Sequence, residues 1–341
     1  MAPKDDAAAA LARLGDAFLE STRNNSDIRQ LTRLVNTTIE LLAGEASSLD
    51  IKIASSAVDE MAQAYAMFAP YRNIPKVSIF GSARTTPDNP IYDTTARTAR
   101  ALADAGFMVV TGAGPGIMEA GMLGAGREKS IGVSIRLPFE TGANSVIAGD
   151  EKYVSMRYFF TRKLMLVKES HAFLCLPGGF GTLDETFELL TLAQTAKSVP
   201  VPIVFLEVAG DPFWSPLMET MEPLLLKHGL ISPSDSTLYK ITDNIDEAVS
   251  EITTFYANYH SIRFINNRLF IRTQRALNDS AIVQLIDTFG YLSADGLIRQ
   301  TSAHEIELRE NDVPSLNRIS LDYNGKGFAD LRPLIDEINR H

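Results

Sequence analysis

A glycine-rich segment, Leu176 to Glu185, constrains the fold of this chain more than any other stretch of its sequence. It reads Leu-Pro-Gly-Gly-Phe-Gly-Thr-Leu-Asp-Glu, it follows an apolar run from His171 to Leu176, and apolar residues at helical spacing continue from Glu185 to Ala196. The pattern predicts a buried strand, a glycine loop and a helix. Glycines let backbone N–H groups approach a ligand, and a helix start adds unpaired donors and partial positive charge. We therefore expect an anion here, most simply a phosphate. The alternative is a tight turn with an ordinary capping box.

Two further glycine loops follow apolar runs. Residues 77–80 precede Gly81 and Ser82, and residues 107–110 precede the segment Thr111 to Ala120. Strands are predicted near residues 77–80, 107–111, 131–136, 171–176 and 201–206, and amphipathic helices lie between them. This alternation predicts an α/β fold, a Rossmann-like doubly wound parallel sheet whose glycine loops gather at its carboxyl edge. The loop from Thr111 to Ala120 lacks the spacing of a dinucleotide fingerprint, and no acidic residue stands clearly at the end of the second strand to hold an adenosine ribose, so we predict a mononucleotide pocket.

The flanking regions predict separate structures. Helical spacing over residues 7–45, and again through Val58, Met61, Tyr65 and Phe68 up to Pro70, predicts a helical N-terminal extension over residues 1–72. The Rossmann-like domain is expected over residues 73–265. Residues 266–341 are expected to form a small α+β domain, with strands at 269–272, 297–301 and 319–323 and helices at 280–289 and 331–338. Its role is left open between an oligomer contact, a lid and regulation.

Composition narrows the class of partner. A net charge of -10 with no compensating basic stretch argues against a nucleic acid. Cys175 lies inside a predicted strand, which favours a buried core thiol. The five histidines show no metal-ligand spacing, so neither a metal nor a cofactor is expected. No apolar run approaches the ~20 residues that cross a bilayer, and Met1 to Asp6 carry no signal-peptide core, so we expect a cytoplasmic protein without a membrane partner.

Specific motifs resemble those of one family. Thr161-Arg162-Lys163, with Met156 upstream, and the complete run from Pro177 to Glu185 resemble the two marks of the LOG family, cytokinin-activating phosphoribohydrolases long mislabelled as lysine decarboxylases. Gly112 to Ala120 resembles the family's Gly-Gly-Gly-Pro-Gly-Ile-Met-Glu-Ala, with Ala113 in place of one glycine. Alanine suits that position if the backbone there needs no positive φ. The resemblance covers roughly residues 75 to 265, and the Phe-x-Thr-Arg-Lys form is similar to that of longer bacterial members.

The resemblance implies an enzyme that hydrolyses the N-glycosidic bond of a nucleoside 5'-monophosphate. Arg162 and Glu185 are then the catalytic pair: Glu185 stabilises the ribosyl cation or orients the attacking water, and Arg162 holds Glu185 and the leaving base. A homodimer or higher homo-oligomer is also implied. The residues expected to bind substrate are Gly81, Ser82, Gly114, Glu119, Lys163, Gly178, Gly179, Gly181 and Thr182.

Other interpretations remain open. Arg162 and Glu185 could form a purely structural ion pair, and Glu119 could serve only as a partner of its helix dipole. Lys163 could be a Schiff-base lysine, although no constellation for a pyridine phosphate accompanies it. The base could be an N6-modified adenine, plain adenine or one of several bases. A different class of protein, a non-enzymatic carrier or sensor of a nucleotide or phosphorylated cofactor, would need the glycines but not the carboxylate of Glu185.

Overall fold

The computed structural model describes residues 13, 26–136 and 142–341, and the chain divides into two compact units, Met1–Tyr65 and Ala66–His341. The described part of the first unit consists of helix α2 (Ser26–Ala43) and most of helix α3 (Ser48–Phe68). Helix α3 ends before Pro70, as its sequence predicts. Of the helical spacing predicted over residues 7–45, the part before Ser26, apart from residue 13, lies outside the described residues.

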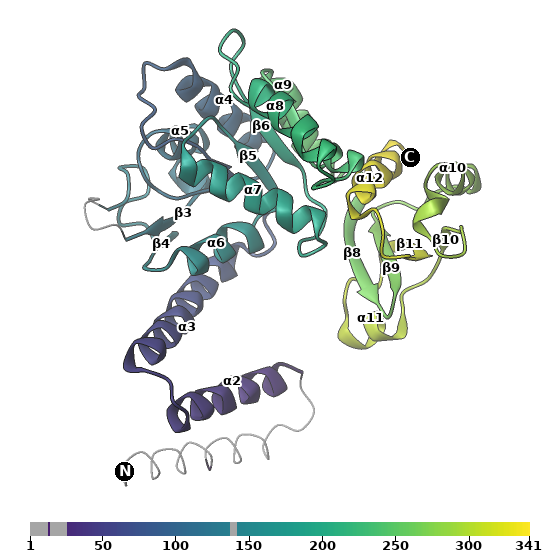
Figure 1. The fold of residues 1–341 in the computed structure, drawn as a ribbon, viewed down its shortest axis with the longest axis horizontal. Helices are drawn as coiled ribbons and strands as arrows, with labels where there is room; N and C mark the ends of the chain where they lie inside the picture. Colours follow the sequence, from purple (N-terminus) through teal and green to yellow (C-terminus); the bar gives the residue numbers. More distant parts are fainter. Residues whose placement is uncertain (1–12, 14–25, 137–141) are drawn as a thin grey trace. The chain divides into compact units, whose positions relative to one another are not determined.

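The second unit contains a seven-stranded parallel sheet in the order β4-β3-β2-β1-β5-β6-β7 (Figure 1). Its strands are β1 (Lys76–Phe80), β2 (Met108–Thr111), β3 (Ser130–Ile135), β4 (Tyr153–Met156), β5 (Ala172–Cys175), β6 (Ile203–Leu206) and β7 (Lys240–Thr242). Its helices are α4 (Pro90–Asp104), α5 (Ile117–Ala125), α6 (Phe159–Lys168), α7 (Phe180–Gln194), α8 (Trp214–Lys227) and α9 (Ile245–Thr254). The predicted fold class, a Rossmann-like parallel sheet, is confirmed.

Helices cover both faces of this sheet. Helices α4, α5 and α9 pack together on one face, and α6 and α7 lie on the other (Figure 1). Val77 of β1, Leu174 of β5 and Leu102 of α4 belong to one buried apolar cluster that joins the sheet to the first helical layer. Cys175 is fully buried, and burial raises the pKa of its thiol to about 12, which confirms a core thiol.

The bounds of several elements differ from those predicted. The edge strands β4 and β7 were not expected; both are short, and pairing with a distant neighbour rather than local pattern defines them. Helix α6 begins at Phe159, so Arg162 and Lys163 lie within a helix rather than before one. Helix α7 begins at Phe180, inside the glycine loop and five residues before Glu185. The loop therefore passes directly into helical backbone.

The C-terminal part forms a four-stranded antiparallel sheet in the order β10-β11-β9-β8. Its elements are β8 (Tyr259–Ile265), β9 (Arg268–Thr273), α10 (Asp279–Phe289), β10 (Arg299–Gln300), α11 (Glu305–Glu310), β11 (Asn317–Asp322) and α12 (Leu331–Arg340). Residues of α10 and α12 share an apolar cluster with Leu269 and Ile319. Strand β8 and helix α11 were not predicted. The sheet thus begins before residue 266, and the three predicted domain ranges stay predictions.

This C-terminal part attaches at the amino ends of the parallel strands. The hydroxyl of Tyr256 donates to the carbonyl of His171, just before β5, at 2.6 Å. Arg332 of α12 forms an ion pair with Glu251 of α9 and lies over the ring of Phe255. The glycine loops lie at the opposite, carboxyl edge, because every one of them follows a parallel strand.

Candidate active site

The glycine loops meet where strand order reverses. Strands β1 and β5 are neighbours, although three strands separate them along the chain. The amide of Ser82, after β1, donates to the carbonyl of Pro177, after β5, at 3.2 Å, and the amide of Ile117 donates to the carbonyl of Ser82 at 3.0 Å. All three loops are therefore joined at one switch point, the place where open α/β sheets bind ligands.

Some glycines at this edge are required by packing. A Cβ added to Gly81 would lie 2.5 Å from Ile117 Cγ2, and one added to Gly178 would lie 2.2 Å from the Thr182 hydroxyl. Gly116 has a positive φ of 68° and would meet the carbonyl of Ser82 at 2.4 Å. Such contacts are closer than van der Waals packing allows. These glycines therefore hold the loops against one another.

Gly179 and Gly181 are not required by packing in this way, because a Cβ added to either would meet no atom within 4 Å. Both residues line a cavity of about 930 Å³ at the carboxyl edge, together with Gly81, Ser82, Gly178, Thr182, Arg162 and Glu185. The fold does not need glycine at these two positions. Their missing side chains instead leave room in the cavity for a ligand to approach the backbone.

Helix α7 begins at this cavity without a side-chain cap. Its N-cap is Gly179, and no side chain accepts a hydrogen bond from the first turn at that position. The first intrahelical bond runs from the amide of Leu183 to the carbonyl of Gly179, at 3.0 Å. Thr182 lies inside the first turn and is buried, so it is not the cap. The capping-box interpretation is wrong, and the helix start presents backbone donors to the cavity.

Arg162 and Glu185 meet at the wall of the cavity. Arg162 Nη1 lies 3.0 Å from Glu185 Oε1, and the side chains are only 10% and 14% exposed. Arg162 Nε also donates to the carbonyl of Val133, at 3.0 Å, which fixes the guanidinium between β3 and α7. Burial raises the pKa of Glu185 above its ordinary value, against the opposing charges of Arg162 and Lys163. The site therefore holds a carboxylate that takes up a proton more readily than an exposed one.

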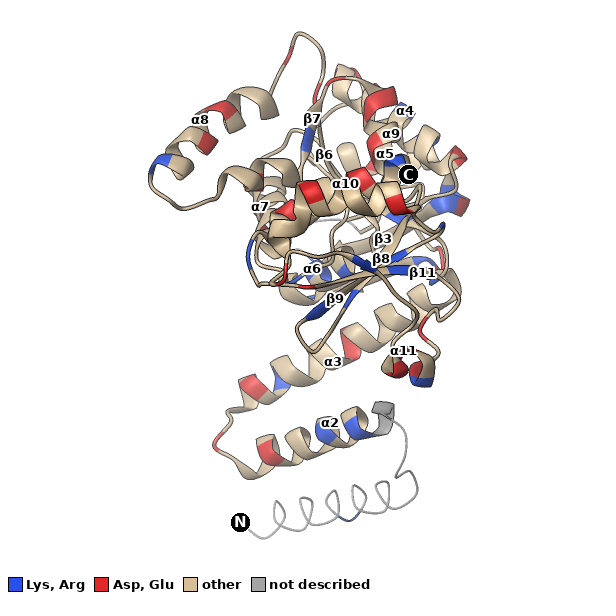
Figure 2. Cartoon of the chain, turned by 90° about the vertical axis from the view of Figure 1, so that its right-hand side faces the viewer, with Lys and Arg blue, Asp and Glu red and all other residues tan. Residues whose placement is uncertain are grey.

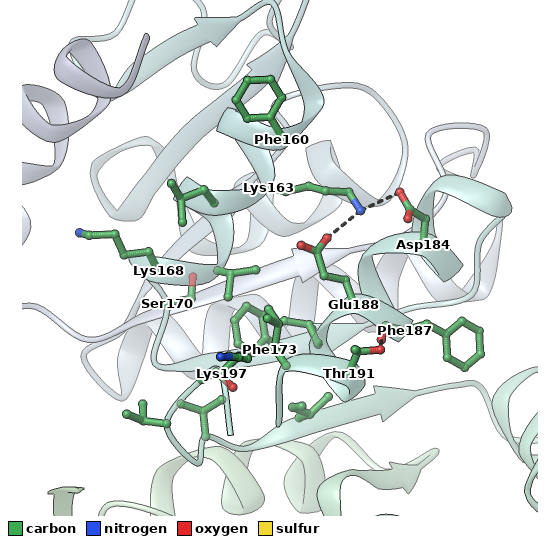
Figure 3. A pocket seen from close by; sticks show the side chains of 18 residues that line it. Phe160, Lys163, Lys168, Ser170, Phe173, Asp184, Phe187, Glu188, Thr191 and Lys197 are labelled. Carbon is green, nitrogen blue, oxygen red and sulfur yellow. Dashed lines mark hydrogen bonds and ion pairs between the residues drawn. The ribbon is translucent and has the colours of Figure 1, made fainter. Parts of the chain in front are cut away.

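Lys163 lies elsewhere, because the next residue of a helix points about 100° away. Its ammonium contacts Asp184 Oδ2 and Glu188 Oε2, each at 2.7 Å (Figure 3). These residues line a second hollow of about 830 Å³ between α6 and α7. Burial lowers the pKa of Lys163, but the two carboxylates outweigh it and leave the pKa above its ordinary value. Lys163 is thus an ion-paired cation rather than an amine prepared for Schiff-base chemistry.

Gly114 and Glu119 also make other contacts. The carbonyl of Gly114 accepts from Asn144 Nδ2, at 3.0 Å. Glu119 interacts with the hydroxyl of Tyr92 on α4, whose pKa is raised by burial and by that carboxylate. Ala113 adopts a φ of 58°, in the left-handed region, so alanine is a costlier replacement for glycine there than the sequence suggested.

Several residues that line the cavity were missed from the sequence. They include Met118, Phe159, Phe180, Phe213 and Leu217, which give the cavity an apolar wall. The carboxylate of Glu207, directly after β6, accepts hydrogen bonds from the amides of Phe213, Trp214 and Ser215 at 2.7 to 3.2 Å and so anchors the start of α8. The position of Glu207 at the carboxyl end of a predicted strand was the available signal.

In the described part of the chain, no helix is both long and apolar enough to cross a membrane. Among the same residues, no group of three or more histidine, cysteine, aspartate or glutamate side chains is arranged to hold a metal ion.

A parallel sheet with joined glycine loops and a buried Arg–Glu pair at its switch point is the arrangement at which open α/β proteins bind ligands. Residues 115–252 match the family described as "Possible lysine decarboxylase". The resemblance to the LOG family that the motifs predicted is thus confirmed over the central part of the chain, and its curated relatives are distant.

Two of these relatives are plant proteins. The "Probable cytokinin riboside 5'-monophosphate phosphoribohydrolase LOGL2" of Oryza sativa subsp. japonica is 27% identical over 126 residues, which are 37% of this chain and 48% of that protein. The "Cytokinin riboside 5'-monophosphate phosphoribohydrolase LOG1" of Arabidopsis thaliana is 29% identical over 101 residues, 30% of this chain and 46% of that protein. The chain thus spans about half the length of these relatives. Among solved structures, the molybdenum cofactor carrier protein of Chlamydomonas reinhardtii is 19% identical, with a TM-score of 0.36 over 52% of this chain and 95% of that one.

Proposed function

We propose that this protein is a nucleoside 5'-monophosphate phosphoribohydrolase that releases a free base and ribose 5-phosphate from adenosine 5'-monophosphate or an N6-modified form of it. The observation that carries the proposal is the Arg162–Glu185 pair, 3.0 Å apart and nearly buried, in the same cavity as the open glycines of the α7 loop. The names of the distant LOG relatives support the same reaction.

In the proposed complex, the 5'-phosphate binds at the start of α7. The backbone at Gly179, Gly181 and Thr182 offers donors there, and the helix dipole favours a negative charge. Glu185 lies one turn further along the helix, which suits it to the ribose and its anomeric carbon. The apolar wall formed by Met118, Phe159 and Phe213 suits a purine base.

The proposed reaction is hydrolysis through a ribosyl cation. The bond between C1' and the base nitrogen breaks, and its electron pair leaves with the base. A water oxygen bonds to C1', while Glu185 accepts the proton that this water releases, which is then available to the departing base. Burial raises the pKa of Glu185 and so brings it closer to the range of a useful general base. Arg162 holds the carboxylate and hydrogen-bonds the leaving base through its planar, permanently charged guanidinium, which does not act as the acid.

We also propose that the protein is a homo-oligomer that uses the hollow between α6 and α7. Phe160, Leu164 and Val199 line that hollow with exposed apolar side chains, at 56%, 44% and 52% exposure. A second copy of the chain would cover this surface. A dimer mass by light scattering would support this, and Leu164→Glu should yield monomers; a wild-type monomer at assay concentration would contradict it.

The test of the activity is chromatographic. The purified chain is incubated separately with AMP and with isopentenyladenosine monophosphate, and free base and ribose 5-phosphate are quantified. We expect base from at least one substrate, and the ratio between them separates an adenine from an N6-modified base preference. Nucleotide binding without cleavage of either would overturn the hydrolase and favour the carrier or sensor.

A further inference from the structure

The loop after β2 brings one glycine against the catalytic arginine. Gly112 follows Thr111, the last residue of β2, and a Cβ built on it would lie 2.2 Å from Arg162 Nη2 and 2.7 Å from Met118 Sδ. Both distances are shorter than any real Cβ contact. We propose that Gly112 is a positioning residue of the hydrolase site, whose missing side chain lets the Arg162 guanidinium sit where it holds Glu185; the proposal rests on the proposed function.

The backbone at Gly112 has little freedom to move away. The amide of Ala113 donates to the Thr111 hydroxyl at 3.0 Å, and the amide of Asn144 donates to the carbonyl of Ala113 at 2.8 Å. The atom that a methyl group would meet, in contrast, is the far end of a flexible side chain. A substitution at Gly112 should therefore move the guanidinium and the Met118 side chain rather than unfold the sheet.

The guanidinium cannot move without losing its partners. Its Nε donates to the carbonyl of Val133 and its Nη1 to Glu185, both at 3.0 Å, so a shift of about 1 Å takes one or both beyond hydrogen-bond range. Misplacement of a catalytic group by that amount can reduce turnover about 100-fold. Gly112 thus acts on the reaction through Arg162, without contact with the substrate.

The same displacement should change how Glu185 titrates. The charged groups that face Glu185 are Arg162 and Lys163 on α6 and Asp184 and Glu188 on α7. Removing the Arg162 contact leaves burial and two like charges less opposed, so the carboxyl should bind its proton at higher pH.

The experiment compares Gly112→Ala with Gly121→Ala in the full-length protein. Gly121 lies on α5, where a new Cβ would lie 3.1 Å from Ile79 Cδ1 and contact no Arg162 atom among its nearest neighbours. We expect Gly112→Ala to lower kcat 10- to 100-fold with a smaller change in KM, and to raise the Glu185 titration midpoint measured by carboxyl carbon NMR. Gly121→Ala should change neither.

A double substitution tests whether Gly112 acts through Arg162. Lysine has no atom equivalent to Nη2, so Gly112→Ala should cost little extra in an Arg162→Lys background, whereas independent effects would add. Additive losses, or a Gly112→Ala variant with wild-type kcat and Glu185 titration, would overturn the positioning role. If the wild type cleaves no nucleotide, the proposed function fails. The Glu185 titration midpoint of Gly112→Ala, compared with that of the wild type, still shows whether Gly112 positions Arg162.

Discussion

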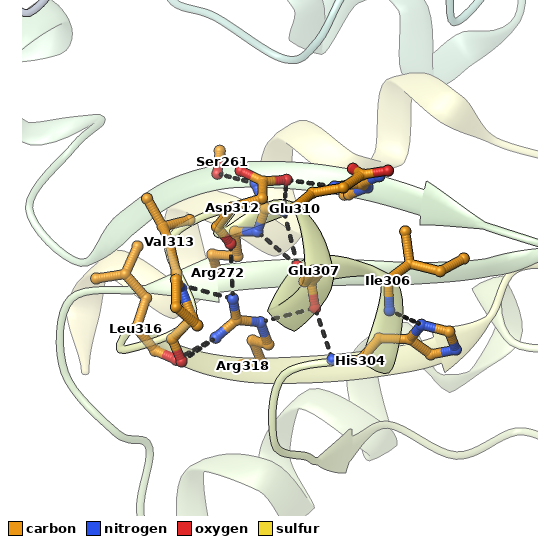
Figure 4. Close-up of polar contacts among 12 residues, drawn as sticks. Ser261, Arg272, His304, Ile306, Glu307, Glu310, Asp312, Val313, Leu316 and Arg318 are labelled. Atoms are coloured by element: carbon orange, nitrogen blue, oxygen red, sulfur yellow. Dashed lines mark hydrogen bonds and ion pairs between the residues drawn. The ribbon is translucent and has the colours of Figure 1, made fainter. Parts of the chain in front are cut away.

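Two buried Arg–carboxylate sites in this chain use the same chemistry in opposite ways. At the carboxyl edge of the parallel sheet, Glu185 accepts one described hydrogen bond, from Arg162, and lines an open cavity. In the C-terminal part, Glu307 of α11 is fully buried. One of its oxygens accepts from Arg272 Nε and Nη2 at 2.9 and 2.7 Å, and the other accepts from Arg318 Nε at 3.1 Å and the His304 amide at 2.9 Å (Figure 4).

The C-terminal network extends beyond Glu307. Arg263 contacts Asp312 and Glu310, each at 2.6 Å, and Arg272 also contacts Asp312. The arginines lie on β8, β9 and β11, and Figure 2 shows these strands carrying basic positions while α11 carries acidic ones. A network in which every charge has partners fixes a short helix against a sheet. Glu185, with spare acceptor capacity beside a cavity, is the carboxylate suited to a ligand.

The pKa directions agree with this contrast. Burial works to raise the pKa of Glu307, but the His304 amide, Arg272 and Arg318 outweigh it and hold the pKa below its ordinary value. At Glu185, burial outweighs Arg162, and the pKa lies above its ordinary value. One carboxylate is thus stabilised as an anion for structure, and the other is left under-stabilised, as functional sites often are.

The largest expected effect is on folding, at the closed network. Glu307→Gln removes the charge that Arg272 and Arg318 share, and breaking a buried pair costs about 3–5 kcal/mol. We expect the melting temperature, followed by circular dichroism, to fall on the order of 10 °C. An unchanged melting temperature would show that the network contributes little. If the proposed activity is present, it should survive at temperatures where the protein stays folded.

At the Arg162–Glu185 pair, a substitution should reduce turnover far more than it reduces stability. Glu185→Gln keeps the shape of the side chain and an acceptor for Arg162, so we expect stability to change by less than about 1 kcal/mol while turnover falls at least ~100-fold. Glu188→Gln is the matched control, because it lies one turn further along α7 and contacts Lys163 instead. Near-normal turnover of Glu185→Gln would remove this residue from the mechanism.

A smaller effect tests whether the open glycines serve a ligand. Gly181→Ala adds a methyl group that meets no protein atom, and alanine favours helix over glycine by up to about 1 kcal/mol. We expect a slightly more stable protein that binds AMP about tenfold more weakly in calorimetry. Gly290 of the C-terminal part offers the contrast, because its Cβ would lie 2.7 Å from the carbonyl of Gly296, so Gly290→Ala should destabilise. If Gly181→Ala bound AMP as tightly as the wild type, the phosphate would not bind against the backbone at Gly181.

The sequence predicts structure well where local pattern decides it and poorly where contacts between distant segments decide it. Apolar runs and glycines act locally, so the sequence predicted the three glycine loops and the strands β1, β2, β3, β5 and β6. The contact of Arg162 with Glu185 also followed from the resemblance to the LOG family. Strand β8 was missed because His260, Ser261 and Arg263 interrupt its apolar pattern. Arg263 pairs there with Asp312 and Glu310, and the hydroxyl of Ser261 accepts a hydrogen bond from Arg272.

The errors at the site have a geometric cause. Lys163 is adjacent to Arg162 in sequence, yet its direction depends on helix α6 beginning at Phe159, which could not be located from the residues alone. Gly112 lies against Arg162, and such a contact between distant segments has no signature in a single sequence. Packing, rather than local pattern, decides which conspicuous residues reach the cavity.

The smallest expected effect, and the most direct measure of the contrast, is the pH dependence of stability. Between the ordinary carboxyl pKa of 4.5 and its raised folded value, Glu185 binds more protons in the folded protein, so its contribution is present at acid pH and is lost as pH rises. Glu307 has a lowered folded pKa, so its contribution is present above 4.5 and is lost as pH falls below it. Each group can change the unfolding free energy by at most about 1.4 kcal/mol per pH unit. Urea unfolding from pH 3 to 8 should therefore give wild-type minus Glu185→Gln and wild-type minus Glu307→Gln differences that slope in opposite directions. If both differences in unfolding free energy changed with pH in the same direction, the two carboxylates would have pKa values shifted the same way on folding. The contrast between a structural and a functional pair would then be contradicted.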